Sequence, residues 1–140
     1  MSALHMTSRH DLAPQEIDAV EVNLYAFNRA ATGRDDGRGL AFLLHDANGA
    51  VAGCAAGYSW AGISELRQMW IAEPYRGSGH GRKLLDAFVG EAVRRGVRRV
   101  WVASYDFQAP GFYEKAGFRR MAELPGWPEG HTNVVLCKTL

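Results

Sequence analysis

The segment that decides the fold reads Arg76-Gly77-Ser78-Gly79-His80-Gly81, and it separates a run typical of a β-strand from a run typical of an α-helix. Its three alternate glycines allow a sharp backbone turn that exposes consecutive N–H groups. The following helix adds unpaired N–H donors and the positive end of its dipole. The segment therefore predicts a phosphate or pyrophosphate site. The alternative is a tight strand–helix turn with no ligand.

Hydrophobic periodicity on either side of this loop predicts the remaining elements. Apolar residues recur at helical spacing from Pro14 to Ala31 and from Leu84 to Val93. A short helix is expected between Pro110 and Ala116. Six strands are expected at Leu40–Asp46, Ala50–Trp60, Ile63–Ala72, Val97–Tyr105, Phe118–Leu124 and Thr132–Lys138. Asn48-Gly49 and Ala61-Gly62 favour tight turns, so the first three strands form an antiparallel meander. This order predicts an α+β domain around one mixed sheet.

Length and charge restrict the classes of protein that fit. With 140 residues the chain is expected to form one domain, residues 1–140. A net charge of +1 gives no field that would attract nucleic acid or a membrane surface. Cys54 and Cys137 lie far apart without a CxxC motif, and no export signal is visible. We therefore expect two buried thiols and a cytoplasmic protein with no membrane or nucleic-acid partner.

Two common nucleotide motifs are ruled out by inspection. A dinucleotide fingerprint starting at Gly77 requires a glycine at position 82, where the chain has Arg82. The Gly-Lys-Ser/Thr triplet of a P-loop occurs nowhere in the sequence. The five histidines lack metal-ligand spacing, so no metal is expected. NAD and ATP are therefore poor candidates for the phosphate ligand.

Two motifs at a fixed separation resemble the GNAT superfamily of acyl-CoA-dependent N-acetyltransferases. Arg76, Gly79 and Gly81 match the family's Arg/Gln-x-x-Gly-x-Gly/Ala loop. A later segment, Phe112-Tyr113 followed by Gly117-Phe118, matches its aromatic-Tyr-x-x-x-Gly-Phe pattern. The resemblance covers about Leu12 to Leu140 and implies the acyl-CoA N-acyltransferase fold. That fold is a three-layer α/β/α arrangement with a mostly antiparallel sheet of six to seven strands, whose first strand would have to come from about His5 to Leu12 or be rudimentary.

The resemblance also implies acetyl-CoA as acyl donor and suggests where it binds. The loop amides would hold the pyrophosphate, and the pantetheine arm would pair with the strand around Met69, Trp70 and Ile71. A splayed gap between Trp70-Ile71 and Trp101-Ala103 would admit the arm. Many relatives have an asparagine seven positions before the tyrosine, where this chain has Asp106. Either Asp106 is an alternative base, or Gln108 makes the amide contact with the cofactor arm that the asparagine makes in relatives. The residues implied at the cofactor site are Met69, Trp70, Ile71, Arg76, Gly77, Ser78, Gly79, His80, Gly81, Arg82, Asp106 and Gln108.

Two residues are candidates for proton transfer in the implied reaction. A protonated amine cannot attack a thioester, so a base must act near the site. Glu65 lies in an apolar strand where the family often has that base; its alternative role is an ion pair with Arg67. Tyr113 matches the family's proton donor to the departing thiolate; its alternative role is packing of the short helix. A backbone N–H near Met69 to Ile71 would stabilise the oxyanion.

The acceptor is harder to predict from the sequence. Tyr25, Asn28, Trp60, Arg67 and Trp127 are candidates for its pocket, and a small primary amine is the leading acceptor. The alternatives are a peptide amine, a non-catalytic acyl-CoA-binding module, or a general nucleotide-binding domain. The family's habit makes a homodimer an expectation. Four arginines, Arg94, Arg95, Arg98 and Arg99, are interpreted as solvated charges near a helix C-terminus.

Overall fold

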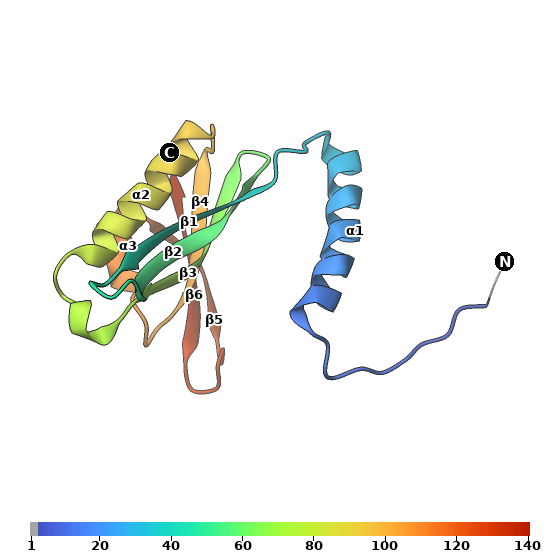
Figure 1. Ribbon diagram of the computed structural model, residues 1–140, viewed down its shortest axis with the longest axis horizontal. Coiled ribbons are helices and arrows are strands. Elements are labelled where there is room, and N and C mark those ends of the chain that lie inside the picture. The colour runs from blue at the N-terminus through green and yellow to red at the C-terminus, as the bar shows by residue number, and fades with distance from the viewer. Residues whose placement is uncertain (1–2) are drawn as a thin grey trace. The chain divides into compact units, whose positions relative to one another are not determined.

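The computed structural model describes residues 3–140, which form two compact units, one ending at Asp35 and one running from Asp36 to Leu140 (Figure 1). The unit that ends at Asp35 contains the helix α1 (Pro14–Thr32). Pro14 occupies its first turn, and Gly33 closes it with a positive φ of 69°. This confirms the helix predicted from Pro14 to Ala31. None of its residues is buried, and residues 5–12 form no strand.

The second unit is built on one mixed sheet of six strands in the order β1-β2-β3-β4-β6-β5. β3 and β4 pair in parallel, and all other neighbours are antiparallel. This confirms the predicted α+β class, with six strands and no contribution from the N-terminal segment. The strands are β1 (Arg38–His45), β2 (Val51–Trp60), β3 (Ile63–Ile71), β4 (Arg99–Tyr105), β5 (Arg119–Pro125) and β6 (Thr132–Thr139).

Both predicted tight turns of the meander are present. Gly49 adopts a φ of 83°, and the Asp46 carboxylate accepts hydrogen bonds from the N–H groups of Asn48 and Ala50. Ala61 and Gly62 both have positive φ, as a two-residue turn between twisted strands requires. The register of the first three strands is therefore set by local sequence.

Three helical segments complete this unit: η1 (Glu73–Tyr75), α2 (His80–Arg94) and α3 (Pro110–Lys115). α2 contacts β1, β2 and β3, whereas α3 contacts β5 and β6 (Figure 1). Side chains of both helices join one core with the sheet. Its fully buried members include Phe88, Leu85, Leu66, Val100 and Leu136. No helix in residues 3–140 is long and apolar enough to cross a bilayer.

One arginine of the predicted solvated cluster has a structural role instead. Arg95 follows α2, and its guanidinium donates hydrogen bonds to the carbonyls of Arg38 and Gly39 and to the Ser59 hydroxyl. It thereby ties the end of α2 to the start of β1. The interpretation as a solvated charge is wrong for Arg95, because three acceptors from two strands converge where the helix ends.

The pairing of β2 with β3 contains a bulge. Gly57 lies opposite Leu66 and Ala56 lies opposite Gln68, so Arg67 is an extra residue on β3. At the bulge the two backbones approach so closely that a Cβ on Gly57 would lie 1.8 Å from the carbonyl oxygen of Glu65. Only glycine fits there, and the bulge bends β3 just beyond Glu65, its last residue paired with β4.

Candidate active site

A cavity opens where β3 and β4 diverge. Their parallel pairing covers only Ile63 to Glu65 against Arg99 to Trp101. Beyond this point the gap leads into a cavity of about 610 Å³. Its lining comes from β3, the glycine loop, β4 and α3: Leu66, Arg67, Met69, Trp70, Ile71, Tyr75, Arg76, Gly77, Gly79, His80, Gly81, Arg82, Val102, Ala103, Ser104, Gln108, Ala109, Phe112 and Tyr113. We call it the gap cavity.

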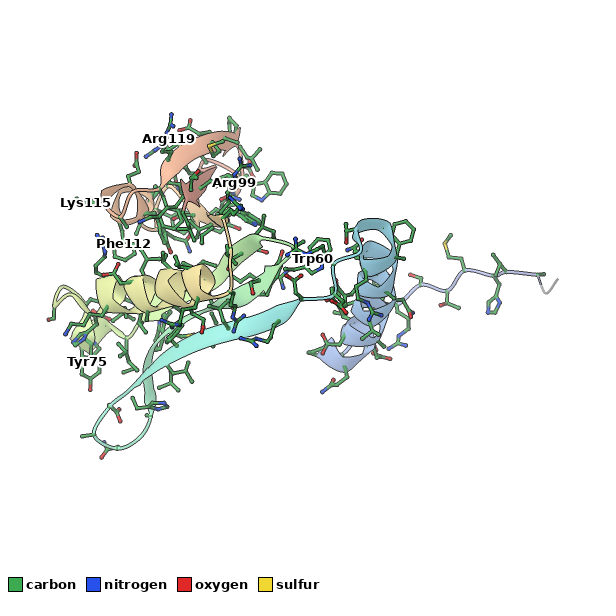
Figure 2. The ribbon with its side chains drawn as sticks, turned by 90° about the horizontal axis from the view of Figure 1, so that it is seen from above. Trp60, Tyr75, Arg99, Phe112, Lys115 and Arg119 are labelled. Carbon is green, nitrogen blue, oxygen red and sulfur yellow. The ribbon has the colours of Figure 1, made fainter. Side chains whose placement is uncertain are left out.

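The glycine loop forms one end of this cavity. Gly77 and Gly79 have φ values of 78° and 86°, which residues with a Cβ rarely adopt. Gly79 is the N-cap of α2, so the free N–H groups of the first helical turn follow it directly. Gly81 lies in that turn, and an added Cβ would come within 3.6 Å of the Phe112 ring, which lies beside it (Figure 2). Ser78 is the one loop residue between Arg76 and Arg82 that does not line the cavity.

Arg76 also fixes the loop to the sheet. Its Nε donates a hydrogen bond of 2.8 Å to the carbonyl of Ile71, at the end of β3. Arg82, on the first turn of α2, pairs with Asp86 and still lines the cavity. Two guanidinium groups thus accompany the backbone N–H groups, which together suit a pyrophosphate.

The backbone of β3 presents hydrogen-bonding groups to the gap. The N–H of Ala72 donates to the carbonyl of Ala52 on β2. Because bonding direction alternates along a strand, Trp70 also faces β2 through its backbone, whereas Met69 and Ile71 face the gap. Met69 therefore offers both of its backbone groups to an extended amide-containing arm, and Ile71 offers its N–H, because the Ile71 carbonyl is already bonded to Arg76. Trp70 lines the cavity through its side chain.

Tyr113 reaches the cavity from α3. The residue is only 6% exposed and packs edge-on against Phe112 and Phe118. Burial raises the pKa of its phenol to about 12, so the group keeps its proton throughout the neutral range. A buried, protonated hydroxyl on the cavity wall can give a proton to an atom bound there. The packing expected as its alternative role is also present.

Glu65 lies at the last paired position before the gap, within a cluster of three polar side chains. Its carboxylate accepts a 3.1 Å hydrogen bond from Nε of Arg67 and a second from the Tyr58 hydroxyl. The Arg67 guanidinium lies over the Tyr58 ring, 4.8 Å from its centre. Burial, followed by the negative charge of Glu65, raises the pKa of Tyr58. The ion pair expected as the alternative role of Glu65 therefore exists.

Tyr58 is a partner of Glu65 that was not predicted from the sequence. The two face each other across β2 and β3, seven residues apart along a chain that turns between them. Once the Ala61-Gly62 turn is accepted, counting back from it would have suggested the pair.

Asp106 and Gln108 differ in what they reach. The Asp106 carboxylate accepts from Nδ1 of His131 at 2.9 Å and from the N–H of Thr132 at 3.0 Å, so it joins two loops. It is absent from the lining of the gap cavity, whereas Gln108 is part of it. The Gln108 Oε1 accepts a hydrogen bond from the N–H of Tyr105, which leaves its NH₂ group as a donor.

The acceptor candidates are dispersed. Arg67 lines the gap cavity, but Trp60 and the exposed Trp127 do not. Tyr25 and Asn28 belong to α1 in the other unit, where Arg29 lies over the Tyr25 ring. Their roles stay predictions. Within residues 3–140, no group of three His, Cys, Asp or Glu side chains could hold a metal ion. Cys54 and Cys137 are free thiols and half-buried.

These features fit coenzyme A by shape and by donor set. The gap is bordered by free strand backbone, its end carries glycine-loop amides and arginines, and its wall carries a protonated phenol. A comparison with known protein families agrees, since the model described as the acetyltransferase (GNAT) family matches residues 5–118. The chain belongs to the GNAT family of acetyltransferases. It is therefore an acyl-CoA-dependent N-acetyltransferase.

Individual relatives and solved structures extend the comparison. This GNAT enzyme is 34% identical to blasticidin-S acetyltransferase of Streptomyces morookaense over 94 residues, 66% of this chain and 68% of that one. A crystal structure of an acetyltransferase from Bacillus cereus superposes with a TM-score of 0.79 and 23% identity, over 98% and 100% of the chains. A GNAT family acetyltransferase from Elizabethkingia anophelis, solved with acetyl-CoA bound, superposes with a TM-score of 0.61 and 18% identity. The superposition covers 97% of this chain and 96% of that one.

Proposed function

We propose that this GNAT enzyme transfers the acetyl group of acetyl-CoA directly to the primary amine of a small molecule, without a covalent enzyme intermediate. The observation that carries the proposal is the gap cavity. It extends from the glycine loop to Tyr113 and to Arg67, so donor groups for a pyrophosphate and a protonated phenol line one cavity. Glu65 does not line the cavity itself but is paired with Arg67 at its border. The family supports acetyl-CoA as the donor.

In this proposal the chain's own residues bind and orient the donor. The loop amides from Gly77 to Gly81, with Arg76 and Arg82, hold the pyrophosphate. The gap-facing backbone of Met69 and Ile71 pairs with the amide arm, and Gln108 donates to one of its carbonyls. An N–H of the same stretch of β3 stabilises negative charge on the carbonyl oxygen. Bound acetyl-CoA supplies the acetyl group as a reactive thioester.

Two side chains move protons. Glu65 takes a proton from the acceptor ammonium, directly or through a water, and so frees the nitrogen lone pair. As the nitrogen–carbon bond forms and the carbon–sulfur bond breaks, Tyr113 gives its proton to the leaving sulfur. Because burial raises the pKa of Tyr113 to about 12, the phenol still carries its proton at neutral pH when the thiolate departs. The nitrogen loses its second proton as the amide forms, and that proton restores the Tyr113 phenol. The proton on Glu65 leaves to solvent, which closes the cycle.

A small-molecule acceptor is favoured by the relatives. The relative at 34% identity is named for acetylation of blasticidin S, an antibiotic. The main alternatives are a peptide amine as acceptor and an acyl-CoA-binding module without activity. A module that only bound acyl-CoA would have no need for a carboxylate and a protonated phenol beside the cavity.

Calorimetric titration with acetyl-CoA, with ATP and NAD as controls, tests the donor. Thiol release with panels of small amines and of peptides then tests the acceptor class. Selective binding of acetyl-CoA with turnover of small amines supports the proposal. If acetyl-CoA binds but no amine causes thiol release, only the binding-module alternative remains. Turnover confined to peptides would show that the acceptor is a peptide amine and not a small molecule.

The base is tested by Glu65→Gln, with Glu123→Gln as a matched control on the exposed strand β5. Glu65→Gln should lower kcat by roughly 10²-fold or more while the Kd for acetyl-CoA stays within about twofold. The loss should be largest at low pH, where more of the acceptor amine carries the proton to be removed. An unchanged kcat across pH would remove Glu65 from this role.

A further inference from the structure

A second hollow crosses β1, β2 and β3 beside Glu65. This groove has a volume of about 480 Å³ and is wider open than the gap cavity. It shares one residue with that cavity, Arg67, which therefore lies between the two spaces. We call it the sheet groove. Its lining consists of Gly39, Leu40, Ala41, Ala56, Gly57, Tyr58, Arg67 and Gln68.

Strand register explains why the sheet is hollow here. Residues opposite each other in antiparallel strands point to the same face. Gly39, Tyr58 and Glu65 follow one another across the three strands, and so do Ala41, Ala56 and Gln68 in the next row. Glycine and alanine leave space above the sheet, and the Tyr58 ring stands beside that space. The result is a floor of small apolar groups, suited to a short carbon skeleton.

Arg67 is the one charged side chain among the described residues that line this groove. It is the bulge residue of β3, and its side chain is 58% exposed, compared with 17% for Glu65. Its Nε is bonded to Glu65, and the flat face of the guanidinium lies over Tyr58. These two contacts fix the plane of the fork and leave its terminal NH₂ groups as donors. Such a fixed fork matches a carboxylate in bidentate geometry.

The contact between Arg67 and Glu65 sets two opposite charges 3.1 Å apart at the junction of the two hollows. An amine alone would need only Glu65. A molecule that carries an amine and a carboxylate a few bonds apart would satisfy both groups, with its carbon skeleton on the alanine floor. When Glu65 takes the amine proton it loses its negative charge, and the bound carboxylate would then replace it as the partner of Arg67.

We propose that the acceptor of this enzyme is an amino acid or a close analogue with a free carboxylate, which Arg67 binds from the sheet groove while Glu65 receives the amine. This inference rests on the proposed function, because it takes Glu65 as the base. It assigns Arg67 to acceptor specificity, so the substrates are selected by a charged group that does not react.

The experiment compares acceptors that differ only in the carboxylate. Leucine, leucinamide and 3-methylbutylamine share one skeleton, and glutamate with its α-amide forms a second set. Thiol release should give a kcat/KM at least roughly 10-fold higher for each free acid, as one charge-assisted bidentate contact implies. Arg67→Gln should reduce this preference to about twofold or less by raising the acceptor KM, and Arg67→Lys should restore part of it.

Controls separate specificity from folding and from donor binding. Arg94→Gln removes an exposed arginine of α2 that pairs with Glu91, and it should leave the preference unchanged. The Kd for acetyl-CoA is measured for every variant, because Arg67 also borders the gap cavity. A change confined to the acceptor KM supports the assignment, and a parallel loss for acids, amides and decarboxylated amines contradicts it.

A second readout keeps this inference distinguishable from the proposed function. Calorimetric titration of amino acids into the protein saturated with coenzyme A reports groove binding without turnover. Binding that depends on Arg67 would support the groove even if no amine were acetylated. Turnover of amides and decarboxylated amines as fast as free acids would overturn the groove assignment and leave acetyl transfer intact.

Discussion

Replacing Gly57 by alanine should destabilise the protein through one backbone contact. The φ of Gly57 is not positive, so alanine faces no intrinsic backbone strain there. Its Cβ, however, would lie 1.8 Å from the carbonyl oxygen and 2.9 Å from the carbonyl carbon of Glu65. Real Cβ atoms essentially never come within 3.0 Å of another heavy atom. Because both clashing atoms belong to the backbone, no side chain can move to relieve the contact.

The geometry sets the size of the effect. Reaching the lower limit of 3.0 Å requires β2 and β3 to separate by about 1.2 Å at the bulge. A shift of that size breaks or weakens about two ladder hydrogen bonds, at about 1 kcal/mol each. Overpacking strain in the adjoining core adds roughly 1–3 kcal/mol. We therefore expect a loss of roughly 3–5 kcal/mol in the free energy of unfolding.

Urea denaturation followed by tryptophan fluorescence measures this loss, with Gly39→Ala as the matched control. Gly39 lies on the neighbouring strand β1, and the nearest atom to its added Cβ is the Gly57 carbonyl oxygen at an ordinary 3.7 Å. Its variant should stay within about 1 kcal/mol of the wild type. If the two variants unfold within 0.5 kcal/mol of each other, on the order of the error in such measurements, the close approach does not govern stability and the reasoning fails.

Further predictions concern the Tyr113 phenol, the glycine loop and the hydrogen bonds of Arg95. Tyr113→Phe should lower kcat by roughly 10²-fold with the acetyl-CoA Kd little changed; a loss of only a few-fold would indicate packing alone. Burial raises the pKa of Tyr113 to about 12, whereas an unfolded tyrosine titrates near 10, so the unfolded chain loses its proton first. This contribution to stability is complete below pH 10 and is lost as the pH rises towards 12. The urea midpoint should therefore fall less between pH 9 and pH 11 for Tyr113→Phe than for the wild type. Gly79→Val should raise the acetyl-CoA Kd at least 10-fold by calorimetry, because valine does not tolerate a φ of 86° at the N-cap; equal affinity would exclude the loop from pyrophosphate binding. Arg95→Met should cost roughly 2–4 kcal/mol in urea denaturation by leaving two strand carbonyls and Ser59 without their donor, and an exposed substitution such as Arg94→Met should cost far less.

Much of the fold could be predicted because the decisive signals are local. Asn48-Gly49 and Ala61-Gly62 define the meander through backbone conformations that few residues adopt. The glycines at 77 and 79 likewise need positive φ, so the loop between β3 and α2 was recognisable without tertiary information. Motifs of this kind combine conformation and chemistry in a few consecutive residues. The glycine loop and Phe112-Tyr113 also supply part of the lining of the gap cavity.

What could not be predicted depends on contacts between distant segments. The partners of Arg95 on β1 and β2 lie 36 to 57 residues away, so its sequence neighbours suggested only a basic cluster. Asp106 meets His131 across 25 residues, which no spacing rule anticipates. The bulge at Arg67 could not be predicted either. A glycine in the neighbouring strand, here Gly57, is equally compatible with a bulge, a bend or an ordinary strand position. The sheet groove follows from that register and became visible only with it.

The divergence of β3 and β4 gives this sheet two inner edges in addition to its outer ones. An unpaired edge is a template for any extended chain, and here the unpaired backbone groups are those of Met69 and the N–H of Ile71, since the Ile71 carbonyl is bonded to Arg76. In the proposed complex, a ligand that fills the gap would work as a removable seventh strand, and its binding would add to the stability of the native state by mass action. Acyl-CoA supply would then govern two quantities at once, the rate of the reaction and the amount of enzyme that escapes aggregation and proteolysis.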